Sequence, residues 1–303
     1  MEGQLRRGLA LPTGADEARL NEAVLSLRAS RLRKIARQPV NMTRSKALEL
    51  ACRRSGRSIE RTATTFWGED MMVVFPDLIS IAISRYGFWE EGLTRFLLGR
   101  LRKGMTFVDV CAYIGYFTLL ASRLVGPEGR VHCFEPAPTS FRILLANVSQ
   151  RTNVAANRVA AWSDNTELVL SHFGPELAAF DTVFPTPRLT SRGSQLVAKY
   201  TITAVRLDDY VNSRGLAPSV IKIDAESAEF EVLRGLTATI EKHRPIITLE
   251  VGDFGIEGAP ASRDVIEFVL ERGYMPFQIQ DRELVPHLLK ERYDYDNVML
   301  LPQ

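Results

Sequence analysis

The sequence predicts a doubly wound α/β fold built on a mostly parallel sheet. From residue 105 onward, short apolar segments alternate with segments of helical period, which is the pattern of strands joined by crossover helices. The segments VIKID and PIITLEV are mainly apolar runs, as expected for strands that are covered on both faces. The last strand segments, MPFQIQD and DNVMLLP, have no helical segment between them, so we expect the sheet to end in an antiparallel strand.

Each predicted element can be placed on the chain. The stretch TATTFWGEDMMVVFP predicts two strands with a turn at Gly68. Two helices follow, over residues 78–87 and 89–104, and the second is expected to end at Gly104. The alternating part predicts strands at 106–110, 130–136, 157–164, 219–225 and 245–251, and helices at 116–126, 139–150, 229–243 and 262–274.

The predicted organisation is a basic helical N-terminal extension over residues 1–62 and a sheet domain over residues 63–303. Between Arg28 and Arg61 there are 11 Lys or Arg residues against two acidic ones. This stretch is either a solvated helical face or poorly ordered arm, or a docking surface for an anionic partner or for a second subunit of a homodimer. It contains no aromatic residue, which disfavours nucleic acid as the partner.

Residues 165–200 interrupt the alternation. They are rich in Pro, Thr, Ser and Gly, and the segment is too long for an ordinary loop. It predicts either an inserted strand pair or a lid over the active site.

Cysteine content and hydropathy predict a cytoplasmic protein without a transmembrane segment. Cys52, Cys111 and Cys133 form no CxxC pair, which argues against a disulfide framework or a cysteine zinc site. The apolar stretch near the N-terminus is too short for a signal peptide, and no apolar run reaches about 18 residues.

Two acidic residues mark a nucleotide-type site. Asp109 lies near the end of the first strand of the alternating part, before the turn CAYIGY, and Glu135 ends the next strand. A carboxylate about 20 residues past such a turn can accept both hydroxyls of a ribose. The turn has one glycine, Gly115, and no GxGxxG pattern. A pyrophosphate needs several close backbone approaches, so an adenosine-type ligand without a pyrophosphate fits better.

More acidic residues follow two later strands. Asp224 ends the strand VIKID, with Glu226 and Glu229 just beyond it, and Glu250 and Asp253 come at the end of PIITLEV. Such carboxylates can cap a helix N-terminus, bind a divalent metal or act as a general base. We expect a polar crevice at this edge of the sheet and catalysis without a metal ion, with a divalent ion as the alternative.

The segment RYGFWEE places three aromatic residues, Tyr86, Phe88 and Trp89, next to two glutamates. It either forms the wall of a pocket that holds sugar hydroxyls or packs its aromatic rings into the core.

In this order, the motifs resemble those of the FkbM-type methyltransferases, which are S-adenosylmethionine-dependent enzymes. The resemblance runs from about residue 65 to residue 301 through FWGEDMMVVFP, RYGFWEEGLTRFL, GMTFVDVCAYIGYFTLLAS, GRVHCFEPAP, NRVAAWSD, VRLDDYV, IKIDAESAEFEVLRG and RPIITLEV. It implies a Rossmann-like class I methyltransferase sheet and O-methyl transfer to a hydroxyl of a sugar, a glycan or another natural product.

The resemblance also implies roles for individual residues. Those implied for S-adenosylmethionine binding are Asp109, Cys111, Ala112, Tyr113 and Gly115 in the turn, Glu135 at the ribose, Ala161 and Trp162 beside the adenine, and Asp224 near the methyl group. The candidates for the catalytic base are Asp224, Glu226 and Glu250.

The sequence departs from the family pattern at three positions. Cys111 and Ser227 stand where the family has glycine, and Tyr113 stands where it has asparagine or histidine. A β-carbon at residue 111 disfavours a positive φ and narrows the backbone approach to a ligand. We expect the turn to bind the cofactor nevertheless.

Two other functions stay open. A catalytically inactive scaffold would bind a partner through the N-terminal arm without methyl transfer. A nicotinamide-dependent oxidoreductase would use a similar sheet but would need further turn glycines, which this sequence lacks.

Overall fold

A computed structural model describes residues 14–30, 33, 38–184, 196–253, 255–256, 258–280 and 282–303. At its centre is an eight-stranded sheet with the order β12-β11-β13-β10-β9-β3-β4-β5. Its strands are β3 (Thr106–Val110), β4 (Arg130–Phe134), β5 (Val154–Asn157), β9 (Val220–Ile223), β10 (Ile246–Val251), β11 (Tyr274–Gln280), β12 (Glu283–Pro286) and β13 (Asp296–Pro302). The strands from β10 to β5 pair in parallel, whereas β13 is antiparallel to both β10 and β11. The predicted fold class and the antiparallel last strand are confirmed.

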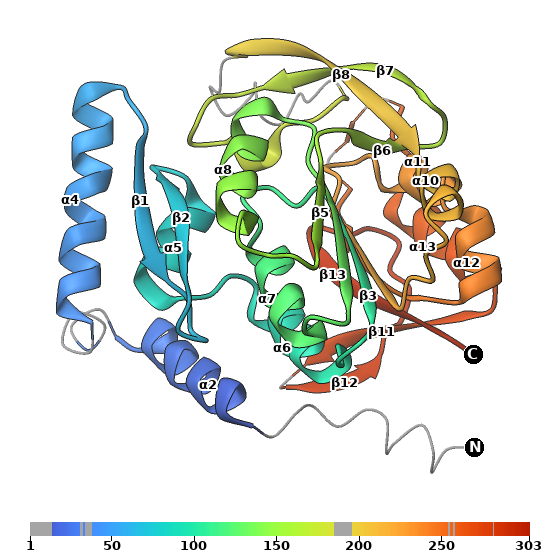
Figure 1. Ribbon diagram of the computed structural model, residues 1–303, viewed down its shortest axis with the longest axis horizontal. Coiled ribbons are helices and arrows are strands. Elements are labelled where there is room, and N and C mark those ends of the chain that lie inside the picture. Colours follow the sequence, from blue (N-terminus) through green and yellow to red (C-terminus); the bar gives the residue numbers. More distant parts are fainter. Residues whose placement is uncertain are drawn as a thin grey trace.

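Helices cover both faces of this sheet (Figure 1). One face carries α7 (Tyr116–Val125) and α8 (Pro138–Val148), and the other carries α10 (Leu207–Ser213), α11 (Glu229–Arg234), α12 (Thr237–His243) and α13 (Ser262–Leu270). Successive residues of β3 enter different cores, because Phe107 packs with α7 whereas Val108 and Val110 pack with the opposite layer. The double cover explains why every residue of β9 is buried.

The third parallel strand differs from the prediction. It is β5. The predicted segment 157–164 does contain a strand, β6 (Ala160–Trp162), but β6 belongs to a separate sheet, so the expected place in the central sheet is wrong. β5 is an edge strand whose four residues are all only partly buried. It therefore lacks the apolar run that marks a central strand in a sequence.

Two predicted helices also end elsewhere. α6 (Glu91–Arg100) stops before Gly104, because the Arg102 guanidinium donates to the carbonyl oxygens of Gly99 (2.7 Å) and Leu101 (2.8 Å). The predicted helix 229–243 is two helices, α11 and α12. At Gly235, between them, a β-carbon would lie 2.0 Å from the Trp162 carbonyl oxygen, so the close approach of β6 requires a glycine there.

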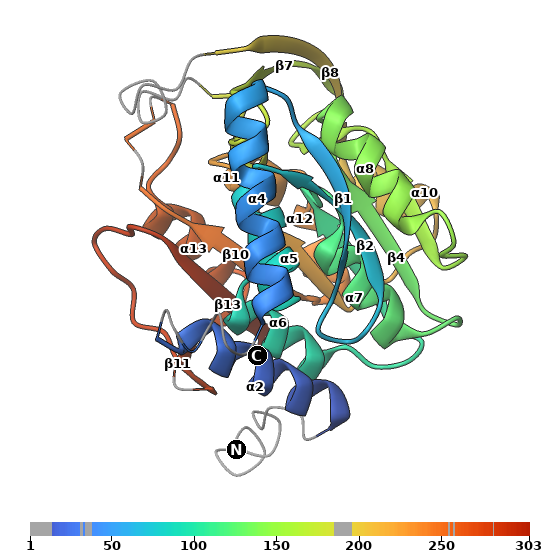
Figure 2. The ribbon, with the colours of Figure 1, turned by 90° about the vertical axis from the view of Figure 1, so that its left-hand side faces the viewer.

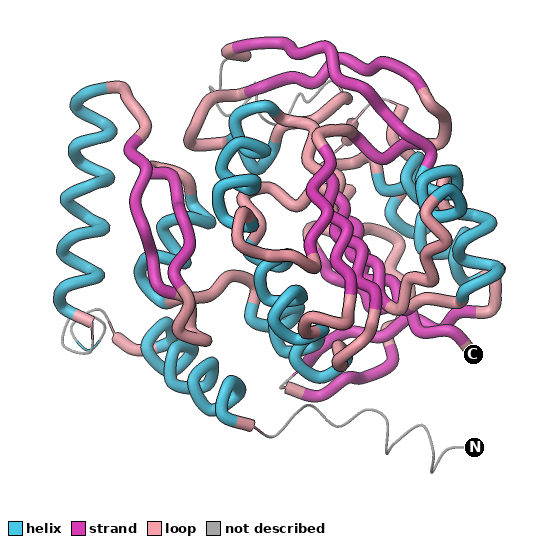
Figure 3. Tube along the Cα trace, viewed as in Figure 1, coloured by secondary structure: helices cyan, strands magenta, loops and turns pink. Residues whose placement is uncertain are grey.

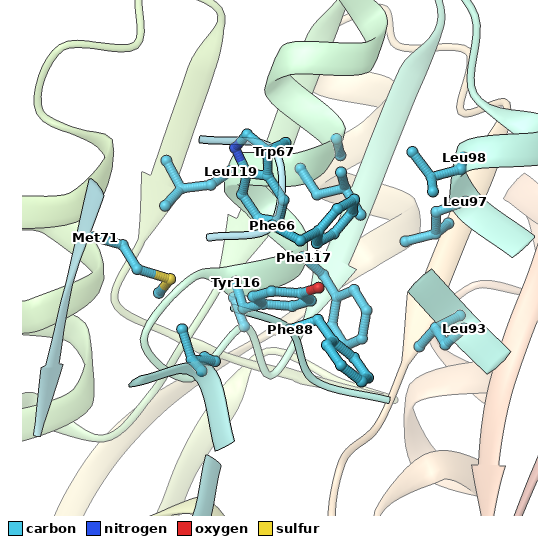
Figure 4. Close-up of a cluster of buried hydrophobic side chains, with 14 of the residues drawn as sticks. Phe66, Trp67, Met71, Phe88, Leu93, Leu97, Leu98, Tyr116, Phe117 and Leu119 are labelled. Atoms are coloured by element: carbon cyan, nitrogen blue, oxygen red, sulfur yellow. The ribbon is translucent and has the colours of Figure 1, made fainter. Parts of the chain in front are cut away.

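An aromatic cluster joins the N-terminal part to the sheet. The hairpin of β1 (Ile59–Thr64) and β2 (Asp70–Phe75) is followed by α5 (Leu78–Tyr86) and α6. Figure 4 shows Phe66, Trp67 and Phe88 around Tyr116 and Phe117, the first residues of α7. The ring centroids of Trp67 and Tyr116 are 5.4 Å apart. This packing fixes the segment after α5 beside the start of α7.

The two N-terminal helices, α2 (Ala15–Arg28) and α4 (Pro39–Ser55), lie outside the hairpin and α5 (Figure 2). Leu20 and Val24 on α2 are fully buried, and Glu49 on α4 accepts a hydrogen bond from Arg85 on α5. β1 spans the expected boundary between residues 62 and 63, and the division into extension and domain, like a dimer through these helices, stays a prediction. None of the helices formed by the described residues is long and apolar enough to cross a bilayer.

The predicted insert contributes a strand pair beyond the sheet edge. β7 (Thr166–His172) and β8 (Ala198–Arg206) pair antiparallel, and β6 lies on the other side of β8. Figure 3 shows these strands lying across one end of the central sheet. Residues 185–195 of the predicted insert lie outside the described residues.

Candidate active site

A cavity of about 580 Å³ lies at the carboxyl edge of the central sheet. Six of the lining residues stand at the carboxyl ends of parallel strands with polar side chains: Cys111 and Tyr113 after β3, Glu135 after β4, Asp224 and Glu226 after β9, and Glu250 in β10. Because the carboxyl ends of parallel strands meet at one edge, residues far apart in the sequence converge here. All six are predicted site residues.

The turn between β3 and α7 has a strained backbone. Cys111 and Tyr113 have φ values of 57° and 52°, in the left-handed region that costs a residue with a β-carbon roughly 1–2 kcal/mol. The Ala112 N–H donates to the Phe134 carbonyl (2.9 Å), which ties the turn to β4. Gly115 has a φ of 90°, and a β-carbon there would lie 2.5 Å from Leu144 Cδ1. The glycine at position 115 is therefore required, whereas the residues at 111 and 113 are tolerated with strain.

Glu135 is held by the same turn. Its Oε2 accepts a hydrogen bond from the Tyr113 N–H and its Oε1 accepts one from the Ala137 N–H, both at 2.9 Å. Burial raises the pKa of Glu135 to about 8, although these two backbone hydrogen bonds act to lower it. Each carboxylate oxygen keeps a further acceptor site, so Glu135 can also accept hydroxyl groups from a ligand in the cavity.

Lys222 is a buried cation beneath the turn, and the sequence analysis missed it. Its Nζ lies 3.1 Å from Asp224 Oδ2 and 3.5 Å from Asp109 Oδ1, and it donates to the Cys111 carbonyl (3.4 Å). Burial alone would lower the pKa of Lys222, but the charges of Asp224 and Asp109 raise it, so the ammonium group stays charged. The sequence did contain a signal for it, since a lysine stands inside the apolar run VIKI. A buried charge requires a partner of opposite charge, so this lysine indicates nearby acids.

The three predicted catalytic acids meet at the ends of β9 and β10. One carboxylate oxygen from each of Asp224, Glu226 and Glu250 lies within 4.8 Å of the others. Burial would raise the pKa of Asp224, but the Lys222 ammonium and a hydrogen bond with Glu250 lower it. Burial and the charge of Asp224 raise the pKa of Glu250 well above its ordinary value. Asp224 is therefore the carboxyl group of the pair that ionises more readily, and Glu250 is the one that keeps a proton more readily.

The same three carboxylates offer the oxygen ligands that a divalent metal ion uses. Lys222 already pairs with Asp224, and its charge would repel a second cation at that carboxylate. The arrangement therefore suits a proton or a singly charged group better than a divalent ion.

The segment RYGFWEE forms a second wall of the cavity. Tyr86, Trp89 and Glu90 line it together with Phe88, which also belongs to the buried cluster of Figure 4. The segment therefore both lines a cavity and packs into the core, while its expected contact with sugar hydroxyls stays a prediction. Glu90 accepts a hydrogen bond from the hydroxyl of Tyr295, which precedes β13 and also lines the cavity. No local pattern in the sequence pointed to Tyr295.

The insert forms a third wall. Leu170, Phe180 and Asp181 line the cavity, and Asp181 hydrogen-bonds His172 Nδ1 (2.8 Å). The Thr182 hydroxyl donates to the carbonyl oxygen of Glu226 (2.8 Å). The insert is thereby tied to the loop that carries two of the predicted catalytic acids.

The remaining predicted cofactor residues lie outside the cavity lining: Asp109, Ala112, Gly115, Ala161 and Trp162. Asp109 is fully buried and accepts a hydrogen bond from the Thr118 hydroxyl (2.6 Å), so it braces α7 and Lys222. Ala161 and Trp162 belong to β6 in the three-stranded sheet rather than to the end of a central strand.

Two other acids of the sheet edge stabilise loops. Glu229 Oε1 accepts hydrogen bonds from the N–H groups of Ala225 (2.8 Å) and Ser227 (3.2 Å). Asp253 accepts them from the N–H groups of Ser262 and Tyr293, both at 2.7 Å. Glu229 therefore holds the loop that precedes α11 (Glu229–Arg234), and its two hydrogen bonds come from that loop rather than from the first turn of the helix.

Known proteins with similar sequences are methyltransferases by name. The chain is 34% identical over 161 residues to the 31-O-demethyl-FK506 methyltransferase FkbM of Streptomyces tacrolimicus, covering 45% of this chain and 61% of that protein. It is 24% identical over 156 residues to the hexuronic acid methyltransferase AglP of Haloferax volcanii, covering 50% and 58%. The chain thus spans about three fifths of the length of the curated relatives it matches.

Solved structures give weaker matches. The methyltransferase FkbM from Methylobacillus flagellatus aligns with a TM-score of 0.42 at 15% identity, over 74% of this chain and 55% of that chain. Aeropyrum pernix fibrillarin, solved with natively bound S-adenosyl-L-methionine, aligns with a TM-score of 0.37 at 15% identity, over 66% of each chain.

The family assignment comes from the sequence model of the methyltransferase FkbM domain. That model matches residues 109–276, from the end of β3 into β11. The match includes the turn after β3, Glu135, Lys222 and the three acids at the ends of β9 and β10. Because it covers more than half of the residues, the chain belongs to the FkbM methyltransferase domain family.

Proposed function

We propose that this protein transfers a methyl group from S-adenosylmethionine to a hydroxyl oxygen of a sugar, a glycan or another natural product. The observation that carries the proposal is one cavity whose lining combines Glu135 with the carboxylates of Asp224, Glu226 and Glu250. The last three have oxygens within 4.8 Å of one another, and the Lys222 ammonium lies 3.1 Å from Asp224. The names of the relatives support it, since each describes a methyltransferase and two of them specify FK506 demethylated at 31-O and a hexuronic acid.

The residues of the cavity fit this cofactor. When bound, S-adenosylmethionine supplies a methyl group on a positively charged sulfur. Glu135 would accept the ribose hydroxyls while its present hydrogen bonds keep the turn in place. The Cys111 and Tyr113 side chains line the cavity beside it.

The acids at the ends of β9 and β10 would handle the proton of the acceptor hydroxyl. As the new C–O bond forms and the methyl–sulfur bond breaks, the acceptor oxygen becomes strongly acidic, so even a carboxylate with a low pKa can take its proton. Lys222 keeps Asp224 ionised for this step, and Glu250 orients Asp224 through their shared hydrogen bond. Most of the acceleration would come from placing the acceptor oxygen behind the methyl group.

We also propose that the insert, residues 165–200, covers the bound acceptor. The hydrogen bond from Thr182 to the Glu226 carbonyl supports this role, because it holds the insert against the cavity, and the contact of Asp181 with His172 braces the insert internally. No metal ion is needed for this chemistry, since the proton acceptor is a carboxylate already charged through Lys222.

The test is a methyl-transfer assay with S-adenosylmethionine labelled in its methyl group and a pool of hydroxylated sugars and natural products. We expect label transfer by the wild-type chain, a loss of about 10²-fold or more in turnover for Asp224→Asn, and smaller losses for Glu226→Gln and Glu250→Gln. Glu167→Gln, on the exposed face of β7, is the matched control and should behave like the wild type. Added EDTA should leave the rate unchanged.

Three results would contradict parts of this proposal. Full turnover by all three acid variants at saturating cofactor would show that the proton acceptor is another group. Loss of activity in EDTA would mean that the carboxylates hold a metal ion. Cofactor binding without transfer to any acceptor would favour the inactive scaffold.

A further inference from the structure

The lining of the cavity is strongly acidic and lacks a cationic side chain. Eight carboxylates line it, and among the described residues no Lys, Arg or His does. Six aromatic side chains share the lining, including Trp89, Phe180 and Tyr295. An enzyme whose acceptor is neutral has no evident need for so many negative groups around it, because each buried carboxylate costs free energy unless it is paired.

Some of these carboxylates have partners that explain them. Glu91 forms ion pairs with Arg28 (2.8 Å) and Arg95 (3.0 Å). Asp181 is paired with His172, and Asp224 with Lys222. Glu135 has its two backbone donors and a place in cofactor binding under the proposed function.

Two others keep oxygens without a partner. Asp77 Oδ1 and Glu90 Oε2 are buried atoms with no hydrogen-bond partner among the described residues. Asp77 lines the cavity although it is only 1% exposed, and its Oδ2 accepts a hydrogen bond from the Ser80 N–H (2.7 Å). Hydrogen bonding from the Tyr113 side chain acts to lower the pKa of Asp77, although no hydrogen bond to Oδ1 meets ordinary geometric limits. A buried oxygen in this state requires an explanation, and a bound water, ion or ligand group is one.

We propose that the acceptor carries an ammonium group as well as the hydroxyl that is methylated, an inference that rests on the proposed function. The carboxylates of Asp77 and Glu90, which keep the oxygens without a partner, would pair with the ammonium group, and the aromatic wall that begins at Tyr86 would face it. An organic ammonium ion gains from aromatic faces as well as from carboxylates. The other carboxylates of the lining would face the positive sulfur and the amino group of the cofactor.

An organic cation fits this lining better than a divalent metal ion. A divalent ion needs several oxygen ligands in a compact set and keeps much of its hydration, so aromatic side chains contribute nothing to its binding. Lys222 lies 3.1 Å from Asp224 Oδ2, which weakens the most compact set of oxygens available.

The proposal makes a prediction about specificity. An acceptor with a carboxylate would meet a lining rich in carboxylates and without a cationic side chain among the described residues, and it should be rejected. The relative from Haloferax volcanii is named for a hexuronic acid, so the two proteins should differ in the charge of the acceptor that they accept.

The experiment compares three phenols of nearly equal size and different charge. Tyramine is cationic, N-acetyltyramine is neutral and 4-hydroxyphenylacetate is anionic. Each is titrated calorimetrically into the full chain saturated with S-adenosylhomocysteine, and into the chain without it. We expect tyramine to bind at least about tenfold more tightly than N-acetyltyramine, and the anionic compound to bind most weakly.

Three variants locate the effect. In Glu90→Gln and Asp77→Asn the preference for tyramine should fall to within about threefold of the neutral compound, because each removes one carboxylate charge. Glu167→Gln, an exposed acid on β7, should keep the full preference. Thermal unfolding of each variant shows whether it is folded.

Every outcome decides the proposal. Equal binding of tyramine and N-acetyltyramine, tighter binding of the anion, or no binding of any of the three would overturn it. Tight binding of Mg²⁺ alone that abolishes the tyramine preference would overturn it in favour of a metal site. If S-adenosylhomocysteine fails to bind, the proposed function fails, while the titrations without it still test the cation site.

Discussion

The acids at the end of β4 and at the ends of β9 and β10 lie at the same sheet edge but are stabilised by different means. Glu135 has two backbone N–H donors and no cation within its hydrogen-bond set, and burial raises its pKa to about 8. Asp224 has the buried Lys222 ammonium at 3.1 Å, and its pKa is lowered. The two backbone N–H donors leave Glu135 with a raised pKa, so we expect it to ionise when a ligand binds. The Lys222 ammonium favours the ionised form of Asp224 before any ligand binds. The first arrangement suits binding and the second suits chemistry.

The largest expected effect comes from removing the lysine that pairs with Asp224. Lys222→Met removes the cation between Asp109 and Asp224 and leaves buried carboxyl groups without their partner. We expect a loss of about 3–5 kcal/mol in the free energy of unfolding, measured by urea denaturation. Lys199→Met, at an exposed position of β8, should change it by less than about 0.5 kcal/mol. A loss below about 1 kcal/mol for Lys222→Met would mean that the lysine does not stabilise the charged edge.

An effect of intermediate size is expected in the pH dependence of ligand affinity, which should follow the ionisation of Glu135. Because the pKa of Glu135 is about 8, the affinity for S-adenosylhomocysteine should rise by up to about tenfold per unit from pH 6 to 8, as the carboxyl group ionises. It should level off above pH 8. Calorimetric titrations at five pH values measure this slope, which should be much flatter in Glu135→Gln. Equal slopes in the two proteins would assign the pH dependence to another group.

The same raised pKa has the opposite consequence for the protein without ligand. The folded state holds the Glu135 proton more tightly than the unfolded state, whose pKa is near the ordinary 4.5. This contribution to stability is therefore complete below about pH 4.5 and is lost as pH rises through about 8. The fall in the free energy of unfolding over this window should be shallower in Glu135→Gln than in the wild type.

The smallest expected effect concerns backbone strain in the turn after β3 and in the loop after β9. Cys111 and Ser227 both have positive φ values, 57° and 77°. Cys111→Gly and Ser227→Gly should each stabilise the fold by about 0.5–1 kcal/mol, because the strain they relieve slightly exceeds the entropy cost of glycine. Only Cys111→Gly should also change cofactor affinity, since Ser227 does not line the cavity. A parallel change in affinity for both variants would show that the strain is not local.

The sheet and the acids of its edge could be predicted because the relevant signals are local. Glu135, Asp224 and Glu250 stand at or next to the ends of strands that their apolar runs identify, and parallel strands bring those ends together. β5 carries no such run because it is an edge strand, so the third strand of the central sheet was predicted later in the chain, over residues 157–164. The place of Ala161 and Trp162 beside the adenine, which the family resemblance implies, stays a prediction.

The outer walls of the cavity could be predicted only in part. The hydrogen bond between Glu90 and Tyr295 joins residues 205 positions apart, and such a contact depends on how β13 enters the sheet rather than on any local period. Lys222 could have been recognised, because a lysine inside a fully buried strand must have acidic partners nearby. That RYGFWEE lines a cavity could be predicted because its aromatic residues and its acids come from one short segment, whereas its contact with sugar hydroxyls stays a prediction.

The most direct test of the central claim is a calorimetric titration of the full chain with S-adenosylhomocysteine at pH 8, beside Glu135→Ala and the exposed control Glu167→Gln. The account predicts binding by the wild type and the control, and a loss of about 10²-fold in affinity for Glu135→Ala, because two hydrogen bonds to a charged acceptor disappear. No binding by the wild type, or unchanged affinity in Glu135→Ala, would contradict the assignment of this cavity as the cofactor site.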